Sequence, residues 1–527
     1  MDNQDKNALV INLTRFGDLI QSQPVLSGLK KLGFSTHLVC LENFASAARI
    51  LNHADCIHPF PGSRFLALLD VSWTSAVREV QDWVNHTSHN HHFELAINLT
   101  PSLSSRLLIR HFQATENRGF FLDEMGFGCY SGNWAAFLQA SSAHRGSSPF
   151  NIVDLFSRSA HMPGIETSLS VIKPDRKNIS AMQDLLARES EDPASAGFIS
   201  FQLGASADRR RWPVEYFASL GDSLFRQLNI CPVLLGTENE RKLARKYQAL
   251  SAFPSINLTG RTNLSQLSAA LTCSKLLVTN DTGTMHLAAG LGVKSLSFFL
   301  ATAQPWDTGP YLENCLCLEP GLDCHPCSFS HECQTGFSCR RSITPDIVFK
   351  AIEGFIQNHS WPVIQCSETR VRLTAFRNDL YCLRPMNKAA MDNYSMWMLI
   401  QQHFYRLFLD EMDIVPPSGH ILPDQSYCKK IREHIRTIAP LLNLAAEQAN
   451  VLKKVAVPSV KKKFLSTWQR LNHELSKSPY LPVLGLMWTY QTQAASTDLH
   501  EIYNTCHRYS LLLNIINDFL SESARKE

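Results

Sequence analysis

Residues 277–291 read LVTNDTGTMHLAAGL, and this stretch decides the fold that the sequence predicts. Its apolar start indicates a buried strand, and the apolar residues within 285–291 recur at the spacing of a helix. In the polar turn between them, Asp281 or Thr282 can cap the helix, and Gly283 lets a ligand approach the backbone closely. A helix N-terminus at such a turn attracts anions. The stretch therefore predicts a phosphate-binding elbow, although an ordinary strand-to-helix turn has the same pattern.

Composition limits the class of protein. The chain has 527 residues, room for about three domains. A net charge of +3 gives no sign of a nucleic-acid partner. No apolar run approaches the roughly 20 residues of a membrane span, and the first residues, MDNQDKN, are too polar for a signal peptide. We therefore expect a cytoplasmic protein without a transmembrane segment.

The first part of the chain has a β-α-β pattern. Residues 8–13 and 36–41 are predicted strands, and residues 18–32 have the apolar spacing of a helix. Such a unit implies parallel strands joined by a right-handed crossover. Ligands of these sheets lie beyond the carboxyl ends of the strands, which places Asp18 at the rim of a cleft. The alternative is that Asp18 only caps its helix.

Signals are weaker between residues 55 and 193. Residues 93–99 indicate a strand and residues 103–111 the helix after it. Four histidines crowd residues 86–92, but without Cys or carboxylates at ligand spacing they indicate an exposed loop rather than a metal site. These histidines are His86, His89, His91 and His92. Residues 120–148 show no clear periodicity, and we assign them no role.

A second α/β unit follows, in which strands and helices alternate from residue 197 to residue 300. This alternation predicts a doubly wound domain, whose strand-end loops at 206–211, 236–240 and 281–284 converge. The three consecutive arginines of the first loop suit a diphosphate, and Glu240 suits ribose hydroxyls. Taken alone, the arginines are equally typical of a solvated surface.

Four spaced motifs carry a resemblance to a known family. They are RFGD at 15–18, GAS at 204–206 followed by RRWP at 210–213, Gly236 with Glu240, and NDTG at 280–283 with HLAA at 286–289. In this order they resemble glycosyltransferase family 9, the ADP-heptose heptosyltransferases, over roughly residues 8–310. The resemblance implies an α/β, GT-B fold: two Rossmann-like doubly wound domains facing across a cleft, with inversion at the sugar and no catalytic metal.

The resemblance also implies residue roles. Asp18 would be the general base that takes the proton of the acceptor hydroxyl. Arg210 stands where the family usually has Lys and would stabilise the leaving diphosphate. Asp281 would bind sugar hydroxyls, and His286 either assists or only packs. The full donor-binding set is Ser206, Glu240, Asp281, Thr282, Gly283 and His286.

A cysteine-rich stretch occupies residues 315–339, CLCLEPGLDCHPCSFSHECQTGFSC. Its later thiols have the spacing of a metal knuckle that suits one structural Zn or Fe ion, while disulfides are the alternative, less favoured in a reducing cytosol. Its placement resembles the Cys-rich finger of the bacterial autotransporter heptosyltransferases, a branch that modifies protein serines and binds iron. The predicted ligands are Cys324, Cys327, Cys333 and Cys339. Cys315 and Cys317 leave the ligand set open.

The chain changes character after the second unit. We predict an N-terminal acceptor domain over residues 1–190, a donor domain with the cysteine knuckle over 191–360, and an α-helical appendage of unknown role over 361–527. Helical patterns in the appendage cover 394–408, 427–439, 441–455, 463–475 and 498–520. Its lysines at 453, 454 and 461–463 form a solvated face or a contact with anionic lipid or an acidic protein.

Two functions remain open. The preferred one is a bacterial glycosyltransferase of lipopolysaccharide biosynthesis, which moves a heptose or related sugar from ADP-heptose or a similar donor to a lipopolysaccharide core or a protein hydroxyl. It would act in the cytoplasm or in peripheral contact with the inner face of the cytoplasmic membrane, without nucleic acid and in an oligomeric state left open. The alternative is a non-catalytic nucleotide-sugar-fold protein, a binding or assembly module that acts through its helical C-terminal domain.

Overall fold

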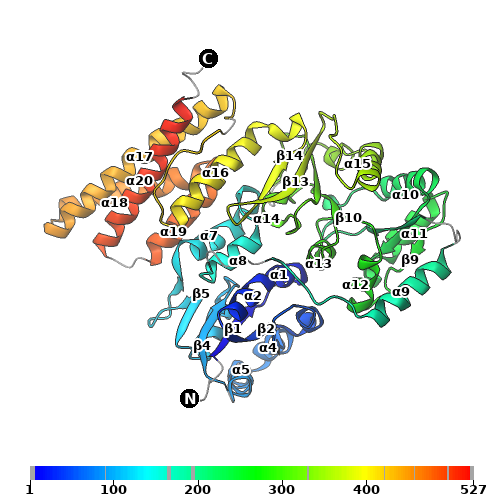
Figure 1. Ribbon diagram of the computed structural model, residues 1–527. Coiled ribbons are helices and arrows are strands. Elements are labelled where there is room, and N and C mark those ends of the chain that lie inside the picture. Colours follow the sequence, from blue (N-terminus) through cyan, green and yellow to red (C-terminus); the bar gives the residue numbers. More distant parts are fainter. Residues whose placement is uncertain are drawn as a thin grey trace. The chain divides into compact units, whose positions relative to one another are not determined.

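A computed structural model describes residues 6–89, 91–162, 168–190, 196–328, 332–419, 422–455, 457–494 and 498–522 (Figure 1). The chain forms two compact units, and each unit takes residues from two separate segments. The first unit comprises Met1–Arg118 and Phe150–Ala390, and the second comprises Gly119–Pro149 and Met391–Glu527. None of the helices in the described ranges is long and apolar enough to cross a membrane.

In the first unit, the parallel part of a six-stranded sheet has the strand order β3-β2-β1-β4. Its strands are β1 (Lys6–Asn12), β2 (Phe34–Leu41), β3 (Cys56–Phe60) and β4 (Phe93–Asn98). Its helices are α1 (Phe16–Gln21), α2 (Gln23–Lys31), α3 (Ala45–Ala48), α4 (Gly62–Val71), α5 (Trp73–Ser88) and α6 (Leu103–His111). The helix predicted over 18–32 is in fact two helices that meet at Ser22, whose hydroxyl donates to the Leu19 carbonyl over 2.7 Å. Because the chain order reverses between β1 and β4, a ligand crevice is expected there.

The second sheet has the parallel order β9-β8-β7-β10-β11-β12. Its strands are β7 (Gly197–Gln202), β8 (Ile230–Leu235), β9 (Ile256–Asn257), β10 (Leu277–Asn280), β11 (Ser295–Phe298) and β12 (Leu316–Pro320). Two antiparallel strands that the sequence did not indicate, β13 (Thr369–Arg377) and β14 (Leu380–Pro385), extend the sheet at β12. The reversal of strand order lies between β7 and β10, so the 277–291 stretch leads directly into the second expected crevice.

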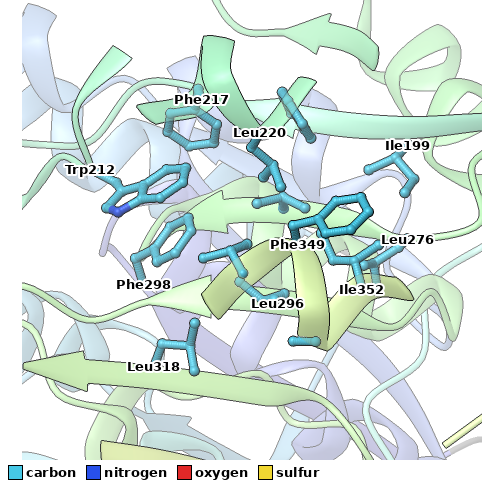
Figure 2. Close-up of a cluster of buried hydrophobic side chains, with 14 of the residues drawn as sticks. Ile199, Trp212, Phe217, Leu220, Leu276, Leu296, Phe298, Leu318, Phe349 and Ile352 are labelled. Carbon is cyan, nitrogen blue, oxygen red and sulfur yellow. The ribbon is translucent and has the colours of Figure 1, made fainter. Parts of the chain in front are cut away.

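The helices of this half begin with α8 (Ile152–Ser159) and α9 (Arg176–Glu189), before the second sheet. Those between its strands are α10 (Val214–Leu228), α11 (Arg241–Leu250), α12 (Leu264–Thr272), α13 (Gly283–Leu291), α14 (Pro305–Thr308) and, after β12, α15 (Pro345–Asn358). Figure 2 shows the apolar core that α10 and α15 share with the sheet. In it Trp212 stacks on Phe298 with ring centroids 4.3 Å apart and donates through Nε1 to the Ile343 carbonyl at 2.9 Å. A buried tryptophan thus fixes the loop after β7 to the sheet.

Two described segments, residues 150–162 and 168–172, contact both halves of the first unit. Asp154 on α8 is buried and accepts from the Tyr311 hydroxyl at 2.7 Å and from the Tyr381 amide at 3.0 Å. Farther on, the Val171 amide donates to the Gly290 carbonyl and the Ile172 amide to the Ile50 carbonyl. Together these segments are therefore bonded to both halves of the unit.

The second unit joins the segment that received no role to the C-terminal helices. Strand β5 (Glu116–Leu122) pairs antiparallel with β6 (Gly128–Tyr130), and α7 (Gly132–Ala143) follows. Trp134 on α7 donates to Asp410 at 2.8 Å, and Asn133 accepts from Gln491 at 2.9 Å. Residues 120–148 therefore belong to the helical unit in packing, although they lie in the first third of the sequence.

The C-terminal helices differ from the prediction at two prolines. They are α16 (Asn393–Leu409), α17 (Gln425–Lys454), α18 (Pro458–Lys477), α19 (Pro482–Ala494) and α20 (Leu499–Glu522). The break predicted at Pro440 is wrong, because α17 continues through this exposed proline while its buried face keeps helical spacing on both sides. Helix α19 was missed because Pro482, which starts it, was taken as part of a loop.

The fold class is confirmed: the first unit holds two doubly wound sheets in a GT-B-like α/β arrangement, and a helical region follows toward the C-terminus. The predicted domain boundary at residue 190 adjoins residues 191–195, which lie outside the described residues. The boundary at residue 360 stays a prediction. Strands β13 and β14, which follow this boundary in the chain, belong to the second sheet.

Three histidine rings of the first sheet lie in contact. His37 on β2 and His58 on β3 have Nδ1 and Nε2 2.9 Å apart, and the ring of His91 stands edge-on to His37 at 4.5 Å. Burial, together with the neighbouring histidines, lowers the pKa of both His37 and His58 to about 4, although Asp55 acts in the opposite direction on His37. The exposed loop predicted for residues 86–92 is therefore wrong for His91, which is half-buried.

This cluster predicts acid sensitivity. Between pH 6.5 and 4 the unfolded chain takes up protons at His37 and His58 that the folded chain does not, so stability should fall as the pH falls through this window. Urea midpoints measured across the window should show the loss, and His37→Gln/His58→Gln should reduce it. The exposed His473→Gln serves as control. A double variant with the parental pH dependence would contradict the assignment.

Candidate active site

The two crevices of the first unit meet at a pair of glycines. A Cβ placed on Gly283 would lie 2.3 Å from Cδ1 of Phe16, and one placed on Gly17 would lie 3.0 Å from Cδ2 of His286. No real Cβ tolerates the first of these distances, so Gly283 cannot carry a side chain unless Phe16 moves. The start of α1 and the start of α13 are therefore in direct contact.

Asp18 lies in the first turn of α1 and is half-buried. It directly follows Gly17, which lies against His286 and Gly283 at the start of α13. The end of β1 is bonded to the end of β4, since the Leu13 amide donates to Thr100 Oγ1 at 2.9 Å. Asp18 thus lies at the carboxyl edge of the first sheet, the position that the β-α-β pattern predicted.

Asn280, the last residue of β10, holds the donor-side loops together. Its buried Nδ2 donates to the Leu203 and Gly204 carbonyls at 3.1 and 2.9 Å, and its Oδ1 accepts from the Trp212 amide at 2.8 Å. One side chain therefore spans the reversal of strand order between β7 and β10. Asn280 belongs to the NDTG motif, but the sequence predicted no role for it.

Three of the predicted residues form one polar chain. Arg210 donates to Asp281 Oδ2 at 2.6 Å and to Ser206 Oγ at 3.0 Å, with the Arg210 and Asp281 side chains 18% and 9% exposed. The guanidinium thus neutralises Asp281 while it lies beside the elbow. An anion bound at the elbow would share Arg210 with this carboxylate.

The N-terminus of α13 has no side-chain cap. Thr282 occupies the N-cap position, yet neither its own side chain nor that of Asp281 caps the helix, so the capping expected from the sequence is wrong. Thr282 Oγ1 instead pairs with Thr279 Oγ1 at 3.1 Å. Uncapped N–H groups at a helix start are a suitable place for phosphate oxygens, here with Arg210 alongside.

Glu240 is connected to the elbow through a residue that the sequence analysis missed. Its Oε2 accepts from the Thr237 amide at 2.6 Å, and its Oε1 accepts from Gln202 Nε2 at 3.1 Å. Gln202 in turn accepts from Thr284 Oγ1 at 3.1 Å. The signal for Gln202 was a buried polar residue at the end of the apolar strand FISFQ. Because Glu240 Oε1 lies where a Cβ of Gly204 would stand, the loop after β7 needs this glycine.

These contacts gather the predicted donor and catalytic residues along the carboxyl edges of the two sheets. His286 is buried and packs against Gly17, which favours the packing role for its ring. The gathered residues are Asp18, Ser206, Arg210, Glu240, Asp281, Thr282, Gly283 and His286.

The four predicted metal ligands line one cavity of about 290 Å³ together with Arg209 and Phe337. Cys324 and Cys333 are exposed, whereas Cys339 is buried. Burial and the three neighbouring thiols raise the pKa of Cys327, and hydrogen bonds from Thr335 and the Phe337 amide lower that of Cys333. Cys315 and Cys317, wholly buried at β12, are not among the described residues that line the cavity.

Thiols are suitable ligands for a soft metal ion, but these four are not arranged to hold one in this structure. Within the described part of the chain, no group of three or more His, Cys, Asp or Glu side chains is arranged to hold a metal ion. The same four cysteines are free thiols in this structure, so the alternative disulfide pairing is not formed here either.

Comparison with known proteins points to one family. The family described as glycosyltransferase family 9 (heptosyltransferase) matches residues 85–336. Lipooligosaccharide heptosyltransferase 2 of Campylobacter jejuni is 26% identical over 162 residues, 29% of this chain and 50% of the relative. Lipopolysaccharide core heptosyltransferase OpsX of Haemophilus influenzae is 29% identical over 109 residues, 20% of this chain and 31% of the relative. This chain thus spans half or less of the curated relatives it matches.

Among solved structures, the E. coli ADP-heptose LPS heptosyltransferase II aligns with a TM-score of 0.49 and 17% identity. The alignment covers 67% of this chain and 99% of that structure.

The role of Asn280 is testable through stability. Asn280→Ala removes an amide that pairs three buried backbone groups, so we expect the free energy of unfolding to fall by about 2–3 kcal/mol. Urea denaturation measures this loss. The exposed Asn239→Ala should change it by less than about 0.5 kcal/mol. An Asn280→Ala protein as stable as the parent would show that the two loops hold together without this side chain.

Proposed function

We propose that this chain, which belongs to glycosyltransferase family 9 through residues 85–336, is an enzyme that transfers a heptose from ADP-heptose or a similar nucleotide sugar to a hydroxyl acceptor. Both named relatives are heptosyltransferases, of lipooligosaccharide and of the lipopolysaccharide core. The observation that carries the proposal is the contact of Phe16 and Gly17, at the start of α1, with the start of α13, since Asp18 directly follows Gly17 and would lie near the elbow that suits a phosphate.

The donor would lie on the second sheet. The diphosphate would meet the N–H groups of Thr282 and Gly283, the Ser206 hydroxyl and the Arg210 guanidinium, which stabilise the charge that develops as the nucleotide leaves. The Arg210–Asp281 ion pair would then weaken, and Asp281 would accept hydrogen bonds from the sugar hydroxyls. Glu240 keeps acceptor capacity for the ribose, because a carboxylate accepts about four hydrogen bonds and Glu240 accepts three, from Gln202 and from the amide and hydroxyl of Thr237.

The acceptor would enter from the side of the first sheet. Asp18 takes the proton of the acceptor hydroxyl while its oxygen attacks the anomeric carbon, and the bond to the diphosphate breaks on the opposite face. This displacement inverts the configuration of the sugar. A core heptose of lipopolysaccharide and a protein serine offer the same hydroxyl chemistry, and we favour the lipopolysaccharide core because the named relatives act there.

Asp18→Asn tests this assignment. The amide cannot take the proton, so turnover should fall at least a hundredfold, while the dissociation constant for ADP-heptose stays within a few-fold. ADP release in the presence of a heptose-deficient lipopolysaccharide acceptor measures the first quantity, and calorimetry measures the second. The exposed Asp70→Asn is the matched control. If Asp18→Asn transferred the sugar at the parental rate, Asp18 would not be the general base and would have only a structural role at the N-terminus of α1.

The non-catalytic alternative makes a different prediction. A binding or assembly module would retain ADP-heptose without releasing ADP, whichever acceptor is supplied. Parental protein that binds the nucleotide sugar but transfers it to neither lipopolysaccharide nor protein acceptors would favour that function.

We further propose one structural Zn or Fe ion at the cysteine cavity, held by Cys324, Cys327, Cys333 and Cys339, as in the Cys-rich branch that this stretch resembles. Four thiolates would fill the coordination sphere and leave no open position for substrate. A modest movement of exposed Cys324 and Cys333 toward the cavity would be needed. The ion would stabilise a segment that has little apolar core of its own.

Elemental analysis tests this ion. The purified chain should contain about one Zn or Fe per molecule. Cys324→Ser should lose it together with thermal stability, while half-buried Cys366→Ser keeps it. Metal-free protein of full stability, or disulfides among these cysteines after thiol trapping, would contradict the proposal.

For the cytoplasmic membrane contact we propose the exposed turn between α17 and α18. Its lysines are Lys453, Lys454, Lys461, Lys462 and Lys463, and its exposed aliphatic side chains are Val451, Val455, Val457 and Leu465. The sequence has no acidic residue between Glu447 and Glu474. Lysines with adjacent aliphatic side chains fit an anionic lipid surface, on which each lysine contributes about 1 kcal/mol.

Vesicle sedimentation tests the contact. The chain should bind vesicles that contain phosphatidylglycerol and not vesicles of phosphatidylcholine alone. Lys461→Gln/Lys462→Gln/Lys463→Gln should weaken binding roughly a hundredfold, whereas Lys242→Gln should have no effect. Equal binding by the triple variant would contradict the proposed contact. The lysines would then bind an acidic protein partner, and the lipid would contact another face of the chain.

A further inference from the structure

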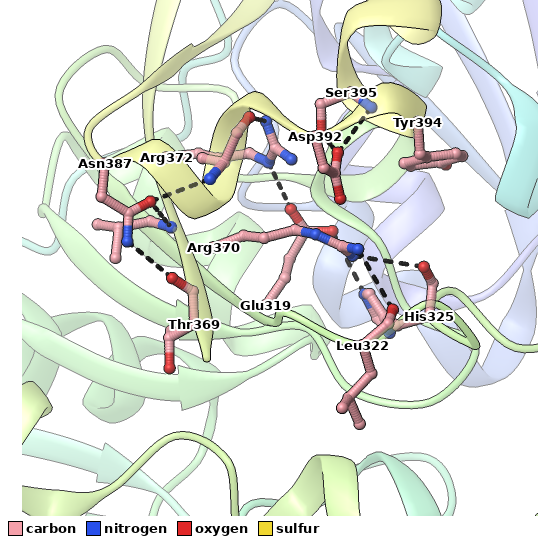
Figure 3. A network of polar contacts seen from close by, with 12 residues as sticks. Glu319, Leu322, His325, Thr369, Arg370, Arg372, Asn387, Asp392, Tyr394 and Ser395 are labelled. Atoms are coloured by element: carbon pink, nitrogen blue, oxygen red, sulfur yellow. Dashed lines mark hydrogen bonds and ion pairs between the residues drawn. The ribbon is translucent and has the colours of Figure 1, made fainter. Parts of the chain in front are cut away.

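The cysteine segment, defined here as residues 322–340, is attached at its start to buried charges of the second sheet (Figure 3). Arg372 on β13 and Glu319 on β12 form an ion pair at 2.5 Å, with side chains 1% and 0% exposed. His325 lies 3.3 Å from the same carboxylate. Although burial alone raises the pKa of Glu319, Arg372 and His325 lower it to about 2, so the pair is ionised.

A second arginine of β13 binds backbone carbonyls at the same end of the segment. Arg370 donates to the Leu322 carbonyl at 3.2 Å and to the His325 carbonyl at 3.4 Å. Figure 3 shows this guanidinium reaching Leu322 and His325, on either side of Cys324. The start of the cysteine segment is therefore held rigidly at the edge of the sheet.

The other end of the segment reaches the donor loop. Arg340 donates through Nη1 to Asp208 Oδ2 at 2.9 Å and through Nε to the Arg211 carbonyl at 2.8 Å. Arg211 itself donates to Asp208 Oδ1 at 2.9 Å. These contacts lie on both sides of Arg210, in the short 3-10 turn Asp208–Arg210.

This turn needs support from outside. A three-residue 3-10 turn has poor hydrogen-bond geometry and no cooperative stability, and no side chain caps the turn at Ala207. Yet it must aim Arg210 at Ser206 and Asp281 at the same time. Arg340 supplies two bonds of fixed direction from a planar guanidinium, the kind of contact that pre-organises a loop before a ligand arrives.

We propose that Arg340 is a positioning residue of the donor site, which holds the 208–211 turn in the shape that lets Arg210 meet a diphosphate. Because Arg340 follows the buried Cys339 directly, its side chain connects the thiol cavity to the nucleotide site, next to Arg209 of the same turn, which lines the cavity. The inference rests on the proposed function for the identity of the ligand. It goes beyond that function by giving the cysteine segment a role in donor affinity.

Calorimetry with ADP on the full chain tests the inference. Arg340→Ala should raise the dissociation constant of ADP about 5- to 20-fold, and Arg340→Lys should restore part of the affinity because Lys still pairs with Asp208. The neighbouring Arg341→Ala is the matched control, because this arginine is exposed. In steady-state kinetics the KM for donor should rise in Arg340→Ala, with the KM for acceptor unchanged.

A double-mutant cycle separates positioning from general damage. If Arg340 acts through Asp208, the losses of Arg340→Ala and Asp208→Ala should not add in the double variant. Arg340→Ala with the parental ADP affinity, or equal losses in Arg340→Ala, Arg340→Lys and Arg341→Ala with a lowered melting temperature, would overturn the inference. Parental protein that fails to bind ADP at all would instead refute the proposed function.

Discussion

The close approach of two backbone turns, at Gly17 and Gly283, is the constraint on which the candidate site depends. A side chain at Gly283 would displace Phe16 and, with it, the start of α1. The two sheets keep this approach because residues 150–162 and 168–172 are bonded to both halves of the unit and because Asp154 is buried against two tyrosines of the second half. Positions that carry no functional group thus determine whether Asp18 can act on a ligand held at α13.

The sequence predicted those parts of the fold whose signal is local. Parallel strands covered on both faces appear as short apolar runs, and their alternation with helices implied two doubly wound sheets and the position of each strand-end loop. The continuity of α17 through Pro440 could not be predicted in this way, since a proline on the exposed face costs less when both flanking turns pack on a neighbour. Likewise, the partners of Trp134 lie more than two hundred residues away, beyond any periodicity.

For the site, residue types were predictable and their pairings were not. Motif spacing identified Arg210, Asp281 and Glu240, but only the structure pairs Arg210 with Asp281 and connects Glu240 to α13 through Gln202. These partners are separated by 38 to 82 residues and meet only because strand order reverses between β7 and β10. The cysteines show the same limit: spacing predicted a metal knuckle, whereas the structure shows four thiols that line one cavity and, within the described residues, no group arranged to hold a metal ion.

The second unit is assembled from two segments that are far apart in the chain. During synthesis, the β5–β6 hairpin and α7 leave the ribosome long before the helices that contact Trp134, Phe137 and Asn133. Their aromatic side chains therefore stay uncovered while the second sheet of the first unit is being made, an interval in which exposed apolar surface favours aggregation or chaperone capture. The C-terminal helices are thus a late-arriving half of a domain begun near residue 119, and a ribosome that stopped before them would release a chain with that domain half built.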